Sequence, residues 1–277
     1  MRKNKLKLKK KNILIMIVLL ISIGFMSYSI YHIITWQKEN NETDDLITHL
    51  VDVAKPVEKN DSELVEIIEQ DDTVPEGNPF WQYAEMNLLY VDFSELKNIN
   101  SKTIGWIEVK GTNVNLPYVQ TNDNKYYLTH SFDNSYNSCG WAFLDYRNKK
   151  DNTDKNTIIY AHGRKNGSMF GSLRNLLKKD WQSNKNNYVI RTSTETENTM
   201  WQIFSVYYLP TTNDYIQVDF KDDNEFLEFT KKITERSMFD FKTSVSKIDR
   251  ILTLSTCYSS TEKLVVHAKL IKKETRK

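Results

Sequence analysis

Residues 251–271 read ILTLSTCYSSTEKLVVHAKLI. Two runs rich in β-branched and other apolar residues, 251–257 and 264–270, flank a short polar segment, which is the pattern of two strands joined by a turn. Cys257 ends the first run, and the chain has only one other cysteine, Cys139. Cys257 is therefore either a small buried apolar side chain or a nucleophile at the end of a strand.

A cysteine nucleophile needs a proton-transfer partner, and histidine is the usual one. Among the five histidines, His32 lies in an apolar N-terminal segment and His49 in the polar segment after it, so both are poor candidates. His267 sits inside an apolar strand, where we expect a structural role. His130 stays undecided. His162 follows NTIIYA and precedes GRKNGS, which indicates a strand end that opens into a glycine-containing loop, so it is the best candidate.

An acyl-transfer site also needs a group that stabilises an oxyanion. Lys263 and Arg250 are the basic residues near Cys257 in the sequence. If the strands around Cys257 pair as a hairpin, Lys263 lies close to the cysteine and Arg250 lies toward the far end. The alternative for Lys263, a solvated charge on a turn, stays open.

Short β-type runs separated by Asn, Asp, Gly and Ser clusters follow from about residue 103, with two helical runs at 168–181 and 224–237. This pattern predicts a mainly β fold, an antiparallel barrel or sandwich with helices at its edge. The strands do not alternate with helices, and no glycine-rich phosphate loop or metal-binding motif is present, so we expect no nucleotide, metal or other cofactor. The expected strands are 103–109, 114–120, 125–132, 140–146, 157–162, 188–192, 200–209, 249–257 and 263–271.

The N-terminal third has a different composition. Residues 1–12 are mostly basic, and residues 13–36 contain no Lys, Arg, Asp or Glu. As a helix, this apolar run spans roughly 30 Å, enough to cross a bilayer. We expect an uncleaved signal anchor at 13–36 with the 1–12 tail cytoplasmic and the remainder extracellular; a cleaved signal peptide is the alternative. The basic tail is explained by this topology and by anionic lipid, so no nucleic-acid partner is expected.

Residues 37–79 are polar and acidic, and we expect a stalk with one or two short helices, at LITHLVDVAK (46–55) and SELVEIIEQ (62–70). The globular domain then occupies residues 80–277 and looks helical in the later part of 80–100. Its length and its apolar and aromatic content are ample for a packed core.

Several segments resemble the class B sortases. TLSTC (253–257) followed by LVVHAKLI (264–271) resembles the paired strands that carry the family's cysteine. NTIIYAHGRKNGSMFGSL (156–173) resembles its histidine segment, and IGWIEVKGTNVNLPYVQTNDNKYYLTHSF (104–132) and CGWAFLDYRN (139–148) also match that class. The resemblance covers about residues 80–272, with the motifs in the family's order.

This resemblance implies a closed eight-stranded β-barrel with N-terminal helices, the first at about 80–97, and a helix before the catalytic strand, at 224–237. It implies a membrane-anchored cysteine transpeptidase on the outer surface of a Gram-positive bacterium. Such an enzyme cleaves the C-terminal sorting signal of a secreted protein after a threonine, forms a thioacyl intermediate and transfers the protein to an amine of the cell-wall precursor.

The family's roles can be transferred to matching positions. Cys257 then is the nucleophile and His162 the general acid and base, while Ser255 and Tyr160 match positions that line the substrate site. A disulfide between Cys139 and Cys257, possible from the count of cysteines alone, is disfavoured by the resemblance because it would block the nucleophile. A buried thiol is the expectation for Cys139.

The chain departs from the family at one position. The family has an arginine shortly before the second strand of this pair, and here Lys263 occupies that place after a shortened turn. Lys263 can substitute for the arginine, or Arg147 or Arg164 can, or turnover is poor. Two alternative functions follow: a cysteine peptidase that releases its product to water, and a sortase-like module that binds cell-wall peptide without turnover.

Overall fold

The structure is a computed structural model, and it describes residues 10–60, 62–68, 76–151, 153–257 and 261–276, with the backbone alone at Lys10, Lys11 and Cys257. Most of the basic tail, parts of the expected stalk and the turn after Cys257 therefore lie outside the described residues. The chain divides into two compact units, Met1–Glu42 and Thr43–Lys277.

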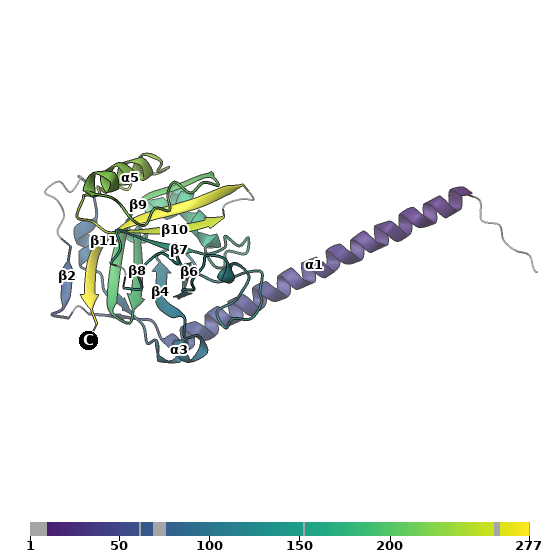
Figure 1. The fold of residues 1–277 in the computed structure, drawn as a ribbon, viewed down its shortest axis with the longest axis horizontal. Helices are drawn as coiled ribbons and strands as arrows, with labels where there is room; N and C mark the ends of the chain where they lie inside the picture. Colours follow the sequence, from purple (N-terminus) through teal and green to yellow (C-terminus); the bar gives the residue numbers. More distant parts are fainter. Residues whose placement is uncertain (1–9, 61, 69–75, 152, 258–260, 277) are drawn as a thin grey trace, which may run out of the picture. The chain divides into compact units, whose positions relative to one another are not determined.

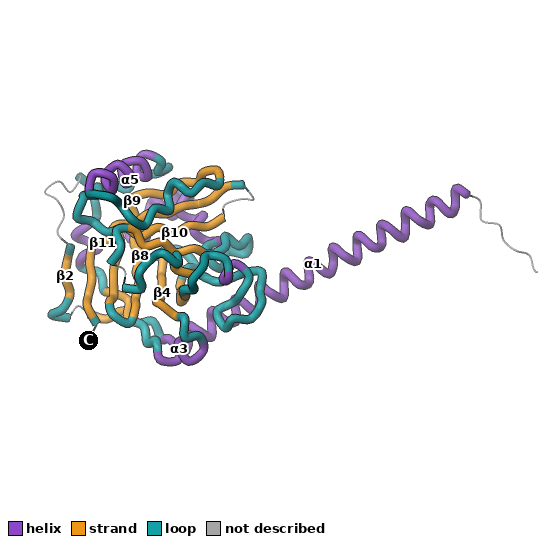
Figure 2. The backbone as a smooth tube through the Cα atoms, viewed as in Figure 1, coloured by secondary structure: helices purple, strands orange, loops and turns teal. Residues whose placement is uncertain are grey.

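Apart from the long helix α1, the described elements are mostly strands, with a few short helices between them (Figures 1 and 2). In chain order they are α1 (Lys10–Ala54), β1 (Val57–Lys59), β2 (Val65–Ile67), α2 (Phe80–Ala84), β3 (Leu88–Tyr90), α3 (Ser94–Ile99), β4 (Thr103–Val109), β5 (Asn115–Val119), η1 (Tyr126–Leu128), β6 (Phe143–Leu144), β7 (Asn156–Tyr160), η2 (Gly171–Leu177), α4 (Lys179–Ser183), η3 (Lys185–Asn187), β8 (Val189–Thr194), β9 (Glu197–Pro210), α5 (Asp223–Glu235), β10 (Ile251–Cys257) and β11 (Glu262–Thr275).

A closed barrel forms the centre of the second unit. Its strands are hydrogen-bonded in the order β10-β7-β6-β5-β4-β8-β9-β11, and pairing of β11 with β10 closes the ring of eight. Strand β2 pairs with the later part of β11, beyond the residues that β10 occupies. Closure satisfies the backbone groups that open sheet edges would expose. The predicted eight-stranded barrel is confirmed.

Strands β10 and β11 are apolar on both faces because both faces are covered. Leu254 and Val266 belong to the larger apolar cluster of the protein. Ile251 and Val265, of opposite parity on the same strands, belong to a second cluster that includes side chains of α5. Since successive side chains of a strand point to opposite faces, α5 covers the outer face here. The predicted helix before β10 is thus present and explains the near-continuous apolar sequence.

One predicted strand and three predicted helices are wrong. The single helix expected at about 80–97 is instead the two short helices α2 and α3 with the strand β3 between them. Residues 125–132 contain the 3₁₀ turn η1, which starts where Asp123 Oδ1 accepts hydrogen bonds from the backbone N–H groups of Lys125 and Tyr126, at 2.6 and 2.8 Å. The expected helix at 168–181 is the 3₁₀ segment η2 followed by the short helix α4. The described part of 62–70 contains β2, because pairing with β11 outweighs the local helical spacing.

Helix α1 begins at Lys10, runs through the apolar segment 13–36 and continues through the first part of the expected stalk. Among the described residues it is the one helix long and apolar enough to cross a membrane. Its last turns belong to the second unit, where Leu50 and Ala54 are fully buried in the larger apolar cluster. The first expected stalk helix is therefore part of the globular unit and packs against its core.

Candidate active site

The pairing of β7 with β10 positions the predicted catalytic residues. The two strands are parallel, and Tyr160 lies opposite Ser255. Cys257 follows Ser255 by two residues at the end of β10, and His162 follows Tyr160 by two residues just beyond the end of β7. Because neighbouring parallel strands run about 4.8 Å apart, this register brings the backbones of His162 and Cys257 to the same edge of the sheet.

Strand β11 brings the third predicted residue to this edge. It is antiparallel to β10, and Lys263 is the residue directly opposite Cys257. Residues directly opposite in an antiparallel pair have Cα atoms about 4.5–5.5 Å apart. Segments that are far apart in the sequence thus bring the backbones of Cys257, His162 and Lys263 close together.

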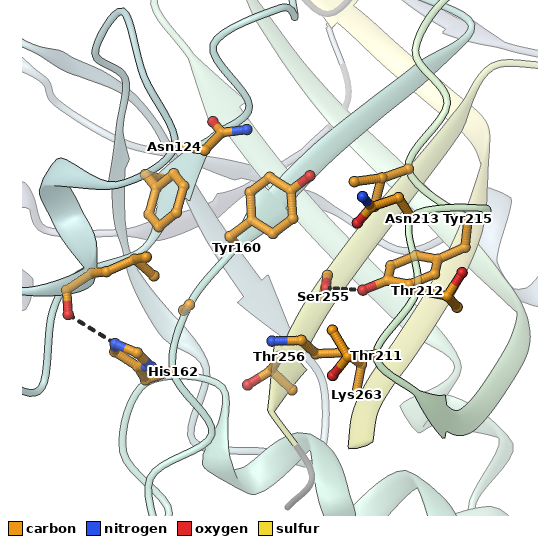
Figure 3. Close-up of a pocket in the computed structure, with 14 residues that line it drawn as sticks. Asn124, Tyr160, His162, Thr211, Thr212, Asn213, Tyr215, Ser255, Thr256 and Lys263 are labelled. Carbon is orange, nitrogen blue, oxygen red and sulfur yellow. Dashed lines mark hydrogen bonds between the residues drawn. The ribbon is translucent and has the colours of Figure 1, made fainter. Parts of the chain in front are cut away.

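A cavity of about 400 Å³ opens at this edge of the sheet (Figure 3). His162, Lys263, Ser255 and Tyr160, the described side chains among the candidate site residues, all line it. Its lining comes from the ends of β7 and β10, the start of β11, the segments around Asn124, Leu128 and Phe143, and the loop between β9 and α5. The described lining residues include no carboxylate, and Lys263 and His162 are the basic ones.

His162 is held from behind by the backbone of another loop. Its Nε2 lies 2.8 Å from the carbonyl oxygen of Leu128, the contact drawn in Figure 3. A carbonyl only accepts, so Nε2 carries a proton and Nδ1 is left for proton transfer when the ring is neutral. Gly140 adopts φ +60°, and a Cβ there would lie 3.0 Å from His162 Cδ2 and 2.4 Å from the carbonyl oxygen of Tyr127. Glycine at 140 thus permits this loop to approach the imidazole closely.

Tyr160 presents its ring to the cavity while its hydroxyl is engaged elsewhere. The hydroxyl donates a hydrogen bond to Asp145 Oδ2 at 2.8 Å, and Asp145 is fully buried. Burial raises the pKa of Tyr160, and the Asp145 charge raises it further, so the phenol stays protonated. For Asp145, burial acts to raise the pKa, but hydrogen bonds from Arg147 and Tyr160 outweigh it and hold the pKa below its ordinary value.

The same interactions engage Arg147, one of the residues considered as a substitute for the family's arginine. Its Nε and Nη2 atoms lie 2.8 and 2.7 Å from the Asp145 carboxylate, and Nη2 also donates to the carbonyl oxygen of Ile216 at 3.0 Å. Arg164 donates to the Ser138 carbonyl oxygen at 3.5 Å. Neither arginine is among the residues that line the cavity, whereas Lys263 is.

The other histidines considered in the globular domain, and Cys139, do not line the cavity. His267 is fully buried, with Nε2 2.8 Å from the Tyr207 hydroxyl and Nδ1 2.9 Å from Thr253 Oγ1, so the expected structural role is confirmed. His130 stacks on Tyr126 outside the cavity. Cys139 is a buried thiol rather than half of a disulfide, as expected.

Sequence reasoning missed the wall supplied by the loop between β9 and α5. This wall consists of Thr211, Thr212, Asn213, Tyr215 and Ile216. The Tyr215 hydroxyl lies 2.9 Å from Ser255 Oγ, a contact drawn in Figure 3. These residues belong to no periodic pattern, so the sequence carried no signal for their position. Asn124, another lining residue, lies in a segment that matches the family, but its residue type alone does not distinguish it from other turn residues.

Comparison with known proteins agrees with this geometry. A family model described as "Sortase domain" matches residues 107–271, which include His162, Cys257 and Lys263. The chain belongs to the sortase family. This sortase is 34% identical over 195 residues to Sortase B of Listeria monocytogenes, a match over 66% of this chain and 75% of that protein. It is 35% identical over 184 residues to Sortase B of Staphylococcus aureus, over 65% and 75% of the respective chains.

Solved structures identify the same class. The crystal structure of sortase B from Bacillus anthracis in complex with AAEK1 matches with a TM-score of 0.68 and 30% identity, over 85% of this sortase and 99% of that chain. The Staphylococcus aureus sortase B–substrate complex matches with a TM-score of 0.61 and 34% identity, over 65% and 84%. The protein is therefore a class B sortase, a family of transpeptidases that act on sorting-signal substrates and amine nucleophiles.

Proposed function

We propose that this class B sortase cleaves the C-terminal sorting signal of secreted proteins after a threonine and joins the new carboxyl end to an amine of the peptidoglycan precursor. The observation that carries this proposal is the strand register that brings the backbones of Cys257, His162 and Lys263 to one cavity. The cavity is open to solvent-borne peptide, and Ser255, Tyr160 and the wall residues would contact the signal.

The proposed chemistry proceeds in two steps. The Cys257 thiolate attacks the threonine carbonyl carbon, and the resulting oxyanion is stabilised by the Lys263 ammonium. The C–N bond then breaks, and His162 gives a proton to the departing amine, leaving a thioester on Cys257. In the second step the acceptor amine attacks the thioester carbonyl, loses a proton to His162, and releases the thiolate.

Lys263 differs physically from the family's arginine. An arginine can offer two parallel hydrogen bonds to an oxyanion, whereas a lysine offers one compact, strongly hydrated charge. The position opposite Cys257 nevertheless allows the ammonium to approach the reacting carbonyl. The role of Lys263 in acylation is therefore the part of the mechanism that is particular to this chain.

The test uses the full chain in detergent micelles, incubated with a mixture of sorting-signal peptides and read by intact mass. We expect an acyl adduct on the wild type and none on Cys257→Ala. Lys263→Met should slow adduct formation by about 10²–10³-fold, the effect of losing one oxyanion donor. Lys231→Met, an exposed lysine on α5, serves as the matched control and should react at the wild-type rate.

The product separates the proposal from its alternatives. Transfer predicts that an added amine, such as triglycine, is incorporated into the released peptide. Release of the free acid in the presence of excess amine would identify a peptidase. Peptide binding without an adduct, in a chain shown to be folded by its circular dichroism, would identify a binding module.

We further propose that residues 13–36 of α1 anchor the enzyme, with the 1–12 tail cytoplasmic and the catalytic unit extracellular. The large apolar side chains from Ile13 to Trp36 are exposed in the isolated chain, as expected for a lipid-facing helix. Basic residues before the span favour this orientation. Protease added to intact cells should digest the catalytic unit while a tag at the N-terminus survives; digestion of that tag would contradict the orientation.

A further inference from the structure

The loop between β9 and α5, which forms one wall of the cavity, has no regular secondary structure. Residues 211–222 contain neither helix nor strand, yet Thr211–Asn213, Tyr215 and Ile216 line the cavity. A segment without backbone ladder bonds takes a fixed position only through side-chain and isolated backbone contacts. The contacts of this loop therefore decide the shape of the cavity.

Several contacts tie the wall to the barrel. The Thr211 N–H donates to the Thr261 carbonyl oxygen at 3.0 Å, and the Tyr215 hydroxyl lies 2.9 Å from Ser255 Oγ. Arg147 Nη2 donates to the Ile216 carbonyl oxygen at 3.0 Å. These bonds attach both ends of the wall to segments of the barrel domain near the candidate catalytic residues.

Asp214, in the middle of the wall, binds to basic side chains of α5. Arg236, at the end of α5, contacts both carboxylate oxygens, with Nη1 at 3.1 Å from Oδ1 and Nη2 at 2.6 Å from Oδ2. Lys232, one turn earlier on α5, lies 2.8 Å from Oδ2. The bond with Arg236, with help from Lys232, holds the pKa of Asp214 below its ordinary value, so the carboxylate stays charged. We name Asp214, Arg236 and Lys232 the α5 clamp.

Helix α5 is a firm support for this clamp. Phe226, Phe229 and Ile233 bury its apolar face in the cluster over β9, β10 and β11. The Arg236 guanidinium lies 5.8 Å from the centre of the Tyr207 ring on β9, so the cation is also held by the barrel. A bidentate carboxylate–guanidinium pair adds directional restraint to its attraction.

Asp214 stands between Asn213 and Tyr215, and both of these neighbours line the cavity while Asp214 faces α5. We propose that α5 positions the cavity wall through the α5 clamp, and that the clamp raises affinity for the part of the sorting signal that contacts the wall. Asp214 and Arg236 are positioning residues, because they act through the loop backbone. The inference rests on the proposed function and assigns a task to α5 within it.

The expected effect is on binding rather than on chemistry. Without the clamp the loop samples positions that do not match the peptide, and the apparent dissociation constant rises as the fraction of the competent conformation falls. Substrate and transition state lose this contact equally, so KM rises while kcat is kept. The thiol and the imidazole, which lie on β10 and beyond β7, are unaffected.

The experiment compares Asp214→Asn, Arg236→Gln, the double variant and Lys231→Gln, all as full chains in detergent micelles. Lys231 forms an exposed pair with Glu235 on the same helix and is the matched control. With the peptide that acylates the wild type, we expect KM to rise about tenfold in both clamp variants, with kcat within about twofold. The double variant should be no worse than either single one, and Lys231→Gln should match the wild type.

Two further measurements keep the result specific. Iodoacetamide is small, and its reaction with Cys257 does not depend on contacts with the cavity wall. Alkylation of Cys257 should therefore proceed at the wild-type rate in all variants. Hydrogen exchange of the amides at 211–217 should accelerate in the clamp variants and not in Lys231→Gln. Unchanged KM or unchanged exchange in folded clamp variants would overturn the inference, as would a parallel fall in kcat and alkylation.

Failure of the proposed function gives a different result. In that case no peptide acylates the wild type, and the affinity of the same peptides, labelled with fluorescein and measured by anisotropy, replaces KM. Weaker binding by about tenfold in the clamp variants would then still support the positioning role. Equal binding by all variants would refute it.

Discussion

Lys263, which we propose takes the role of the family's arginine, lies directly opposite Cys257 in the antiparallel pairing of β10 and β11. It lines the cavity with His162, while Arg147 is engaged by Asp145. Of the three basic residues considered for the arginine's role, Lys263, Arg147 and Arg164, Lys263 alone is among the described residues that line the cavity.

Restoring the arginine tests that placement. Lys263→Arg should accelerate acylation by roughly threefold to tenfold, because a fork of two N–H donors stabilises an oxyanion better than a hydrated ammonium does. The measurement is the single-turnover rate of adduct formation with the peptide that acylates the wild type. Lys247→Arg, an exchange outside the cavity lining, is the control. A slower Lys263→Arg enzyme would show that the site is shaped for lysine.

His267 predicts a pH dependence of stability. Burial lowers its pKa from 6.5 to about 3, so the folded protein holds the imidazole neutral, while the unfolded chain protonates near pH 6.5. Between these values the unfolded state binds more protons, and stability is lost as the pH falls. The contribution of His267 to the free energy of unfolding is fully present above about pH 6.5. It decreases by about 1.4 kcal/mol per pH unit as the pH falls toward 3.

Urea unfolding of the full chain in detergent, followed by tryptophan fluorescence at several pH values, measures this slope. His267→Gln should be less stable near neutral pH, since its bonds to Tyr207 and Thr253 are disturbed, and should show a shallower loss of stability between about pH 6 and pH 4. His130→Gln, outside the core, should keep the wild-type slope. Equal slopes for all three proteins would contradict the assignment.

Among the elements, β7 and β10 contribute the most to the site, since their parallel register aligns Tyr160 with Ser255 and hence His162 with Cys257. A shift of one residue would turn alternate side chains to the other face. Helix α5 contributes from outside the barrel, by covering β10 and β11 and by holding Asp214.

The start of α5 depends on one side chain. Asp222 accepts hydrogen bonds from the backbone N–H groups of Asn224 and Glu225, both at 3.0 Å. Asp222→Ala should lower the free energy of unfolding by about 1 kcal/mol, the usual cost of losing such a cap. Asp223→Ala, in the same turn, should cost less than half of this because it removes only a charge near the helix dipole. Equal losses in urea unfolding would show that Asp222 acts through charge alone.

For the whole molecule, the division between the two compact units, Met1–Glu42 and Thr43–Lys277, lies within α1. Thr43 accepts a hydrogen bond from the side chain of Asn137 at 3.3 Å, and Leu50 and Ala54 are buried in the core of the catalytic unit. The boundary placed at residue 80 from composition remains a prediction, but these contacts indicate that a shorter N-terminal deletion is needed to keep the unit intact.

Two deletions test this. Removing residues 1–42 should release the protein from the membrane fraction and keep acylation of the peptide. Removing residues 1–54 also removes Leu50 and should cost at least the 2–5 kcal/mol expected for deleting one buried leucine side chain. The measurements are fractionation of cells and thermal unfolding of the released protein. Equal stability of the two deletions would show that residues 43–54 are dispensable.

Much of this enzyme could be predicted from residue order. Strand positions such as 103–109 and 200–209 followed from apolar and β-branched runs, because burial of one or both faces imposes them locally. The helix at 224–237 followed from its 3.6-residue periodicity. Cys257, His162 and Lys263 followed from residue type, strand ends and family resemblance, and the structure places the histidine and lysine side chains at one cavity.

Contacts between distant residues decided the rest. Residues 62–68 have helical spacing but pair with β11, and 125–132 have strand composition but turn around Asp123. The cavity wall at 211–216, its clamp to Arg236 and the engagement of Arg147 by Asp145 involve no local pattern at all. Local propensities are worth fractions of a kcal/mol per residue, whereas strand pairing in a closed barrel together with burial of apolar side chains stabilises by more, so packing overrides them. Local sequence patterns therefore determined most of the strands, and residue type identified the candidate reactive residues, whereas the packing of segments far apart in the chain determined the shape of the cavity they share.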